Sequence, residues 1–313
     1  MRAFVILLLT GILYSCSEEK ESVATVAEEQ VAQLPETDTP AHLGGCILMD
    51  PRGKVPEDLY AVSDVIPTTA ISPFTKELQV YGLALVAQDN ASDDFMRLVA
   101  KTIVEIFPQR DDLDLSLQRE VIANQYRYRA LIPVPLGDDF SFMEQNAERW
   151  AELESAYSIC DIIMQDVPAR QGMEVVEHIL HYVSDIGLHY TFPDEWGIHR
   201  SSKLAVAMQF AIDNGYYDVS GYDDIDDAEV RFRVEMQEFA YWFISTAWNL
   251  QEPYGPAEEQ EWLIKNQEEL KQKFSSMYET YENTAGRVMV PPSIVTLQQI
   301  GPTWAEEKSK IER

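Results

Sequence analysis

The chain has 313 residues, of which 46% are hydrophobic and 11% aromatic, and its formal net charge is −29 at pH 7. This length and apolar content suffice for one large globular domain or two small ones. Only 24 Lys and Arg residues stand against 53 Asp and Glu residues, and they form no basic run, which excludes nucleic acid as a partner. A solvated acidic surface explains the charge most simply, although it also suits a saline exterior or cation binding.

The first segment, residues 1–15, has the pattern of a signal peptide. Arg2 precedes the apolar residues 4–9, and Leu-Tyr-Ser-Cys at residues 13–16 resembles a lipobox, whose cysteine is lipidated after cleavage. The apolar stretch is too short for a comfortable transmembrane helix. We therefore expect an exported lipoprotein of the outer membrane or cell surface, anchored in the membrane through Cys16. An ordinary secretory leader with a chance cysteine is the alternative.

The next segment, residues 16–45, is rich in Glu, Ala, Thr and Pro and lacks aromatic residues. This composition predicts an acidic disordered linker that separates the membrane from a single folded domain at residues 46–313. Cys46 and Cys160 are the two remaining cysteines, and in an oxidising compartment they could form a disulfide. Their spacing has no metal-site character.

The first half of the folded chain is expected to mix strands and helices. Short apolar runs bounded by turn residues indicate strands, whereas apolar residues at helical spacing indicate helices. In chain order, we predict a buried strand at 80–86, a helix at 93–107, a strand at 126–134, a helix at 142–157 and a short strand from 162.

The second half is expected to be helical. In chain order, we predict an amphipathic helix at 173–188, a helix at 201–214, an acidic loop or helix start at 223–229, a long helix at 230–250 and a polar helix at 258–281. The elements together predict a helix-dominated α+β domain with a small N-terminal sheet.

One stripe of the helix predicted at 173–188 carries acids and imidazoles. Each helical residue advances by about 100°, so on a helical wheel the other side chains of this stripe fall within about 60° of its first member, Glu174. The stripe consists of Glu174, Glu177, His178, His181 and Asp185. A surface helix whose polar side meets water explains the stripe equally well. However, four of the five histidines lie within residues 178–199, and i,i+3 or i,i+4 spacing lets two side chains share a metal ion.

A glutamate in the next long helix is the second candidate. Apolar residues surround almost the whole circumference of the helix predicted at 230–250, so Glu238 is expected to be buried. A buried carboxylate needs a partner, because isolated burial of a charge costs several kcal/mol. An ion pair with Arg231 and a metal ion shared with His181 are both open.

The pattern of these acids and histidines resembles the metal-binding motif of a known family. The zincin metallopeptidases have His-Glu-x-x-His on one helix and, in one branch, a third ligand Glu on a later helix. The chain has Glu177-His178-x-x-His181 and Glu238, so the first two motif positions are exchanged. It is more closely similar to a set of exported proteins without an assigned activity that have Glu-Glu-x-Leu-His in this place. The resemblance covers residues 78–300 and is distinctive over 174–250. Further matching elements are Gly187, residues 190–193 and residues 222–224.

The resemblance implies a zincin-like fold with Glu177, His181 and Glu238 as metal ligands. This set is harder than His-His-Glu, so it would hold Zn²⁺ less tightly and accept Mn²⁺ or Ca²⁺ more readily. The exchange also removes the carboxylate that would take a proton from the attacking water. His178 or Glu174 would then serve as the catalytic base, or hydrolysis is lost.

Other chemistries have less support. The sequence has no Gly-rich phosphate loop and no Gly-x-Ser-x-Gly turn. The acidic residues 218–227 lack the closing Glu and central Gly of a calcium loop. Tyr222 could stabilise an oxyanion, but we favour a loop tyrosine packed on the surface.

Three functions remain. The favoured one is a lipid-anchored metallohydrolase that cleaves a peptide or protein substrate, with His178 or Glu174 assisting the metal. The second is a catalytically inactive member of the same fold that acts as a surface binding or scaffolding module. The third, an acidic solute- or glycan-binding lipoprotein, is supported only by its location and its Trp and Tyr content. Metal binding separates the first from the other two.

Overall fold

The computed structural model describes residues 42–43, 46–47, 51, 53–167, 170–255 and 261–303, all within one compact unit. The predicted signal peptide, Cys16 and most of the predicted linker therefore lie outside the described residues. A two-stranded antiparallel pair, β1 (His42–Leu43) and β2 (Cys46–Ile47), begins within the last residues of the segment predicted as linker. Among the described residues, no helix is long and apolar enough to cross a membrane.

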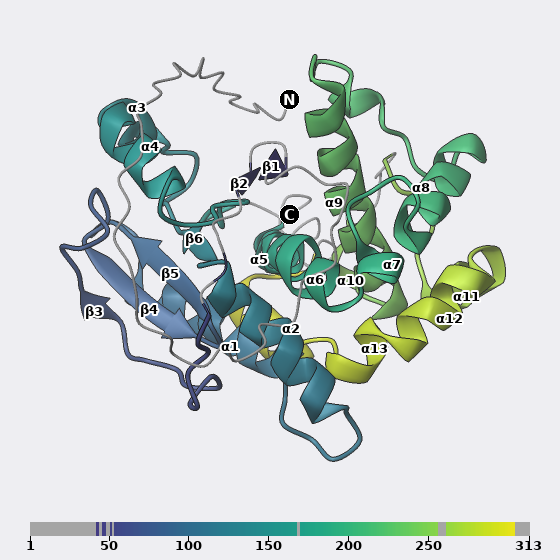
Figure 1. The fold of residues 1–313 in the computed structure, drawn as a ribbon, viewed down its shortest axis with the longest axis horizontal. Helices are drawn as coiled ribbons and strands as arrows, with labels where there is room; N and C mark the ends of the chain where they lie inside the picture. The colour runs from purple at the N-terminus through teal and green to yellow at the C-terminus, as the bar shows by residue number, and fades with distance from the viewer. Residues whose placement is uncertain are drawn as a thin grey trace, which may run out of the picture. The chain divides into compact units, whose positions relative to one another are not determined.

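A four-stranded sheet forms one part of the unit (Figure 1). Its order is β3-β4-β5-β6; β3, β4 and β5 pair antiparallel, and β5 and β6 pair parallel. The strands are β3 (Ile66–Pro67), β4 (Lys76–Val80), β5 (Leu83–Ala87) and β6 (Leu131–Pro133). Every residue of β5 is buried because alternate side chains enter two different hydrophobic clusters, one on each face of the sheet.

The strand predicted at 80–86 is split by a hairpin turn. Tyr81 and Gly82 both have positive φ, 46° and 78°, as a tight two-residue hairpin turn requires. A side chain at Gly82 would lie 2.9 Å from the carbonyl oxygen of Ile122, so the turn also packs closely on the helix behind it. The residues predicted to form one strand therefore belong to the end of β4, a turn and β5.

The two helices that connect β5 to β6 differ in how well the sequence predicts them. The helix predicted at 93–107 is confirmed as α1 (Asp93–Ile106), whose N-cap Ser92 accepts the backbone N–H of Phe95. The strand predicted at 126–134 was wrong in its first half, because α2 (Leu115–Arg127) precedes the short β6. Gln118 and Gln125 on the buried face of α2 hid its apolar periodicity; each donates to a distant carbonyl.

Two further predicted elements are interrupted. The helix predicted at 142–157 is α3 (Ser141–Glu144) and α4 (Ala147–Glu154). No strand starts at 162 in the described part of the chain; isolated bridges join Ala130 to Ser158 and Leu136 to Gln165. A disulfide joins Cys46 in β2 to Cys160, with 4.3 Å between their Cα atoms.

The remaining regular elements of the described residues are helices, in agreement with a helix-dominated α+β class. The central elements are α5 (Gln171–Tyr182), the π-helix η1 (Val183–Leu188), α6 (His189–Thr191), α7 (Pro193–Trp196), α8 (Lys203–Asp213), the 3₁₀-helix η2 (Ser220–Tyr222) and α9 (Ala228–Ala247). The last elements are α10 (Gln251–Tyr254), α11 (Gln267–Lys273), α12 (Ser275–Asn283), α13 (Ala285–Val288) and α14 (Ile294–Ile300).

The helices predicted at 201–214 and 230–250 are confirmed as α8 and α9. The polar helix predicted at 258–281 was wrong in part: α11 and α12 are separate, and Trp262 before them is fully buried and donates to Thr246. Residues 256–260 lie outside the described residues. The pair that positions the candidate site is α5 and α9, which pack against each other (Figure 1).

Candidate metal centre

Glu177, His181 and Glu238 converge between α5 and α9. One ligand atom from each residue lies within 4.8 Å of the other two. Their spacing on α5 puts Glu177 and His181 one turn apart on the same face, and α9 presents Glu238 to that face. All three are at most 5% exposed. The structure therefore brings the three predicted ligands together, and buried groups of these types can hold a metal ion.

His181 stands at the centre of this group. Its Nε2 lies 3.7 Å from Glu238 Oε2 and has no hydrogen-bond partner among the described residues. Its Nδ1 lies 2.5 Å from Asp161 Oδ2. Asp161 was missed by the sequence analysis because it lies in the irregular segment after α4, where no periodicity points to it.

The charged groups around His181 shift the pKa values of both His181 and Asp161. Burial lowers the pKa of the His181 imidazole, but Glu238 and Asp161 outweigh burial and raise it to about 10. Burial raises the pKa of Asp161, but His178 and His181 outweigh it and bring this pKa down to about 2. Without a metal ion, the imidazole is therefore protonated and Asp161 ionised at neutral pH.

The two predicted catalytic residues lie beside this group and face each other. His178 Nδ1 is 3.1 Å from Glu174 Oε1, and His178 Nε2 is 3.6 Å from Asp161 Oδ1. Glu174 also accepts the backbone N–H of Met164 at 3.0 Å. Burial lowers the pKa of His178, but Asp161 and Glu174 raise it well above its usual value. Asp161, His178 and His181 form a second group with metal-ligand spacing.

An arginine completes the electrostatics of the first group. Arg170 Nη2 lies 3.6 Å from Glu177 Oε2, and the Arg170 side chain is more exposed than the Glu177 side chain. Arg170 therefore partly neutralises the charge of Glu177 from the N-terminal end of α5. Since Arg170 is the residue just before α5, sequence periodicity gave no reason to place it there.

Asp185, the last member of the predicted stripe, does not join the metal-ligand groups. It is fully buried and lies 3.1 Å from Arg233 Nη1, which also donates to Gln237. Burial raises the pKa of Asp185 to about 6 although Arg233 opposes the rise. The π-helix η1 explains the change of direction, because its wider turn rotates the residues after Tyr182 away from the α-helical stripe.

The alternative partner of Glu238 is engaged elsewhere. Arg231 donates to the carbonyl oxygen of Ile225 at 2.8 Å and pairs with Asp223 at 3.4 Å. The ion pair between Arg231 and Glu238 that the sequence left open is therefore not among the contacts of Arg231 in the described structure. On the neighbouring helix, His181 Nε2 lies 3.7 Å from Glu238 Oε2.

Tyr222 is buried, so the surface position favoured for it was wrong. It is 5% exposed and donates to Glu261 Oε1 at 2.6 Å, and Trp242 donates to the same oxygen at 2.9 Å. Its hydroxyl proton is therefore already used within the fold.

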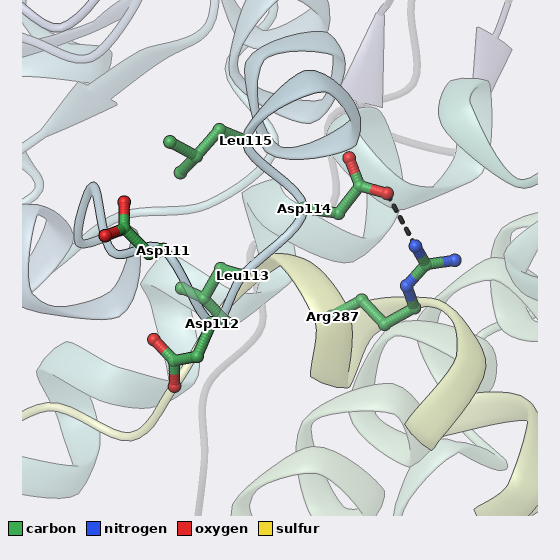
Figure 2. A pocket seen from close by; sticks show the side chains of 6 residues that line it. All are labelled: Asp111, Asp112, Leu113, Asp114, Leu115 and Arg287. Atoms are coloured by element: carbon green, nitrogen blue, oxygen red, sulfur yellow. Dashed lines mark hydrogen bonds and ion pairs between the residues drawn. The ribbon is translucent and has the colours of Figure 1, made fainter.

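A surface cavity of about 530 Å³ lies elsewhere in the unit (Figure 2). It is lined by Leu113, Leu115 and three aspartates, and Figure 2 shows Asp114 bound to Arg287 of α13. Asp114 also caps the N-terminus of α2, and Asp112 pairs with Arg110. None of the metal-ligand residues lines this cavity.

No family model, no curated protein and no solved structure matches this chain.

Proposed function

We propose that this chain is a lipid-anchored extracytoplasmic protein of zincin-like fold that binds one divalent metal ion through Glu177, His181 and Glu238. The observation that carries the proposal is the convergence of these three buried ligand groups within 4.8 Å of one another. One imidazole and two carboxylates form a set that accepts Zn²⁺ and, more readily than a His-rich set does, Mn²⁺.

The burial of the group supports a cation at its centre. Carboxylates removed from water cost several kcal/mol each unless an opposite charge compensates them. Arg170 approaches Glu177, and a protonated His181 faces Glu238, so the group without a metal balances its charge with a proton and a guanidinium. A divalent ion would replace the proton on His181, and its additional positive charge would compensate the ionised Asp161 on the other side of the ring.

We propose hydrolysis of a peptide or protein substrate as the reaction. Glu177, His181 and Glu238 would hold the ion through three side chains, the number of protein ligands that catalytic zinc sites use, and the bound metal would supply a Lewis acid for a carbonyl oxygen. The pair of Glu174 and His178 lies beside the ligands and offers a carboxylate and an imidazole for proton transfer.

A second candidate function is a catalytically inactive surface module for binding or scaffolding. The observation that favours it is the place of His178, which occupies the family's position for the basic carboxylate and is itself held between Glu174 and Asp161. The hydrolase requires both the metal and turnover, whereas the binding module requires neither.

Metal content of the purified full-length chain tests the proposal. We expect close to one equivalent of Zn²⁺ or Mn²⁺ per chain by elemental mass spectrometry after incubation and dialysis. Glu238→Gln and His181→Ala should lose the ion. The matched control is Glu229→Gln on the same helix, where the side chain is 69% exposed and paired with Arg200.

The outcomes separate the two functions. Wild-type chain that retains no Zn²⁺, Mn²⁺ or Ca²⁺ would remove the metal site and with it the hydrolase. Metal that is retained, with cleavage of a peptide library that Glu238→Gln abolishes, supports the hydrolase. Metal that is retained without cleavage of any peptide supports the binding module.

A further inference from the structure

The shortest polar contact of the candidate site joins a ligand to a residue outside the ligand set. Asp161 Oδ2 lies 2.5 Å from His181 Nδ1, on the side of the ring away from Glu238. We propose that Asp161 is the positioning residue of the metal site: it accepts a hydrogen bond from Nδ1–H of His181 and so turns Nε2 towards Glu177 and Glu238. This inference rests on the proposed function.

The chemistry of imidazole gives this contact its consequence. A neutral ring carries one proton, and only the other nitrogen can bind a metal ion. A carboxylate at Nδ1 keeps the proton there, fixes the ring plane and makes Nε2 a stronger ligand. Nε2 is the nitrogen that has no hydrogen-bond partner in the described structure and lies nearest to Glu238.

Asp161 is itself held in place by the residue that follows His181. The Tyr182 hydroxyl accepts the backbone N–H of Asp161 at 3.1 Å and that of Cys160 at 3.0 Å, and donates to the carbonyl oxygen of Leu131 at 2.6 Å. Tyr182 is fully buried. The segment that carries Asp161 is therefore attached to the same turn of α5 that carries His181.

Two further restraints fix the carboxylate. Its second oxygen, Oδ1, accepts the backbone N–H of Ile162 at 2.8 Å and lies 3.6 Å from His178 Nε2. The preceding residue, Cys160, is bound to Cys46 by the disulfide. A group restrained at its backbone, at Oδ1 and through its neighbour is suited to orienting another side chain rather than to moving during a reaction.

A competing assignment makes Asp161 a ligand of a second ion with His178 and His181. The 2.5 Å contact opposes this assignment, because an Nδ1 that donates a proton to Asp161 has no free electron pair for a metal ion. The two assignments differ in stoichiometry: positioning predicts one ion per chain, whereas a second group of ligands predicts two.

The test compares Zn²⁺ affinity of the full-length wild-type chain with that of Asp161→Asn, measured by competition with a chelator. The substitution keeps the volume and removes the charged acceptor, and loss of such a partner weakens metal binding by about 10- to 100-fold. The matched control is Asp166→Asn, which removes the same charge from an exposed residue of the same segment. Asp166 has φ of 64°, a conformation that Asn also adopts readily.

A spectroscopic measurement separates positioning from a general loss of structure. In ¹⁵N-labelled wild-type chain, with or without Zn²⁺, the Nδ1 proton of His181 should resonate far downfield, as protons in short charge-assisted hydrogen bonds do. It should vanish or move upfield in Asp161→Asn and remain in Asp166→Asn. Circular dichroism and the unfolding temperature report whether the variants are folded.

Each combination of results either supports or overturns the positioning role of Asp161. A wild-type chain that binds one Zn²⁺, together with weaker binding and loss of the downfield proton in Asp161→Asn, supports the positioning role. If folded Asp161→Asn binds Zn²⁺ as tightly as wild type, the positioning role is overturned while the metal site stands. Two ions in wild type and one in the variant overturn it in favour of a ligand. A wild type that binds none of Zn²⁺, Mn²⁺ and Ca²⁺ overturns this inference and the proposed function together.

Discussion

His181 shows what single residues contribute to this site, because its two ring nitrogens face carboxylates from different parts of the chain. Nδ1 meets Asp161 from the irregular segment before α5, and Nε2 faces Glu238 from α9. In the sequence, apolar residues surround Glu238 on its helix, so this carboxylate is expected to be buried and to need a partner, for which a metal ion shared with His181 is one option. Nothing in the sequence around Asp161 indicates its role, because a loop residue follows no period.

A second histidine allows a test of how burial alone changes a titration. His189 is 1% exposed, and its Nδ1 accepts the backbone N–H of Ile198 at 2.9 Å. Burial, with a smaller contribution from the charge of His199, lowers the pKa of His189 to about 4. In the unfolded chain the same group titrates at about 6.5.

The sign of the effect follows from these two pKa values. Above about pH 6.5 His189 is neutral in both states, so its contribution to stability is fully present. As the pH falls towards 4, the unfolded chain takes up a proton that the folded chain does not, so the free energy of unfolding decreases. The loss from this residue amounts to at most about 3 kcal/mol.

We predict that His189→Gln removes this part of the pH dependence. Urea unfolding of wild type and variant at pH 7 and pH 4.5 should show a stability difference that shrinks or reverses at the lower pH. The difference between the two proteins is the quantity to use, because Asp185, with a pKa raised to about 6, has the opposite sign in the same range. Parallel pH profiles of the two proteins would contradict the prediction.

At the scale of elements, the π-helix η1 is the feature that the sequence did not indicate. A single α-helix was predicted over residues 173–188, whereas α5 ends at Tyr182 and η1 continues to Leu188. The side chain of Gln125 from α2 donates to the carbonyl oxygen of Tyr182 at 2.7 Å, where the helix changes type. The buried polar face of α2 thus supports the turn that redirects Asp185 towards α9.

Gly187 lies in η1 against Val121 and Gln125 of α2. A Cβ at this residue would lie 2.8 Å from Val121 Cγ1 and 3.0 Å from Gln125 Nε2. Gly187→Ala should therefore destabilise the protein by about 1–3 kcal/mol, the usual cost of overpacking a buried contact. Thermal and urea unfolding measure the change.

Gly172 in α5 provides the control for this substitution. A Cβ there would meet only the carbonyl oxygen of Leu297, at an ordinary 3.7 Å. Gly172→Ala should be neutral or stabilise by up to about 1 kcal/mol, because Ala is the better helix former. Equal stability of the two variants would show that η1 and α2 can separate without cost.

At the scale of the whole molecule, the disulfide and the sheet connect segments that are far apart in the sequence. Cys46 and Cys160 are 114 residues apart in the sequence, and their bond links β2 to the segment that precedes Asp161. The sheet contributes two buried faces, one to each hydrophobic cluster. Buried residues of α5 and α9, the two helices of the candidate metal centre, belong to the larger of these clusters.

We predict that loss of the disulfide lowers the stability of the whole unit. Closing a loop of this length stabilises by about 4–5 kcal/mol in the chain-entropy treatment. Wild-type chain in reductant, and the double variant Cys46→Ser with Cys160→Ser, should unfold at a clearly lower temperature than the oxidised chain. The double variant serves as its own control, since reductant should not change it further; an oxidised wild type no more stable than the double variant would contradict the prediction.

The sequence by itself determined the parts of this protein that depend on local periodicity. Helical spacing put Glu177 and His181 on one face, the apolar circumference of residues 230–250 predicted a buried Glu238, and the abundance of helical patterns indicated a helix-dominated α+β class. Each of these follows from side chains a few residues apart, whose relative directions a regular backbone sets.

The tertiary structure alone decided which groups from distant segments meet. It brought Asp161 to His181, Arg170 to Glu177 and Arg233 to Asp185, and it replaced the predicted strand at residue 126 with the end of α2. The physical reason is that these contacts depend on the path of irregular segments and on a π-turn stabilised by Gln125 from another helix, and neither leaves a period in the sequence.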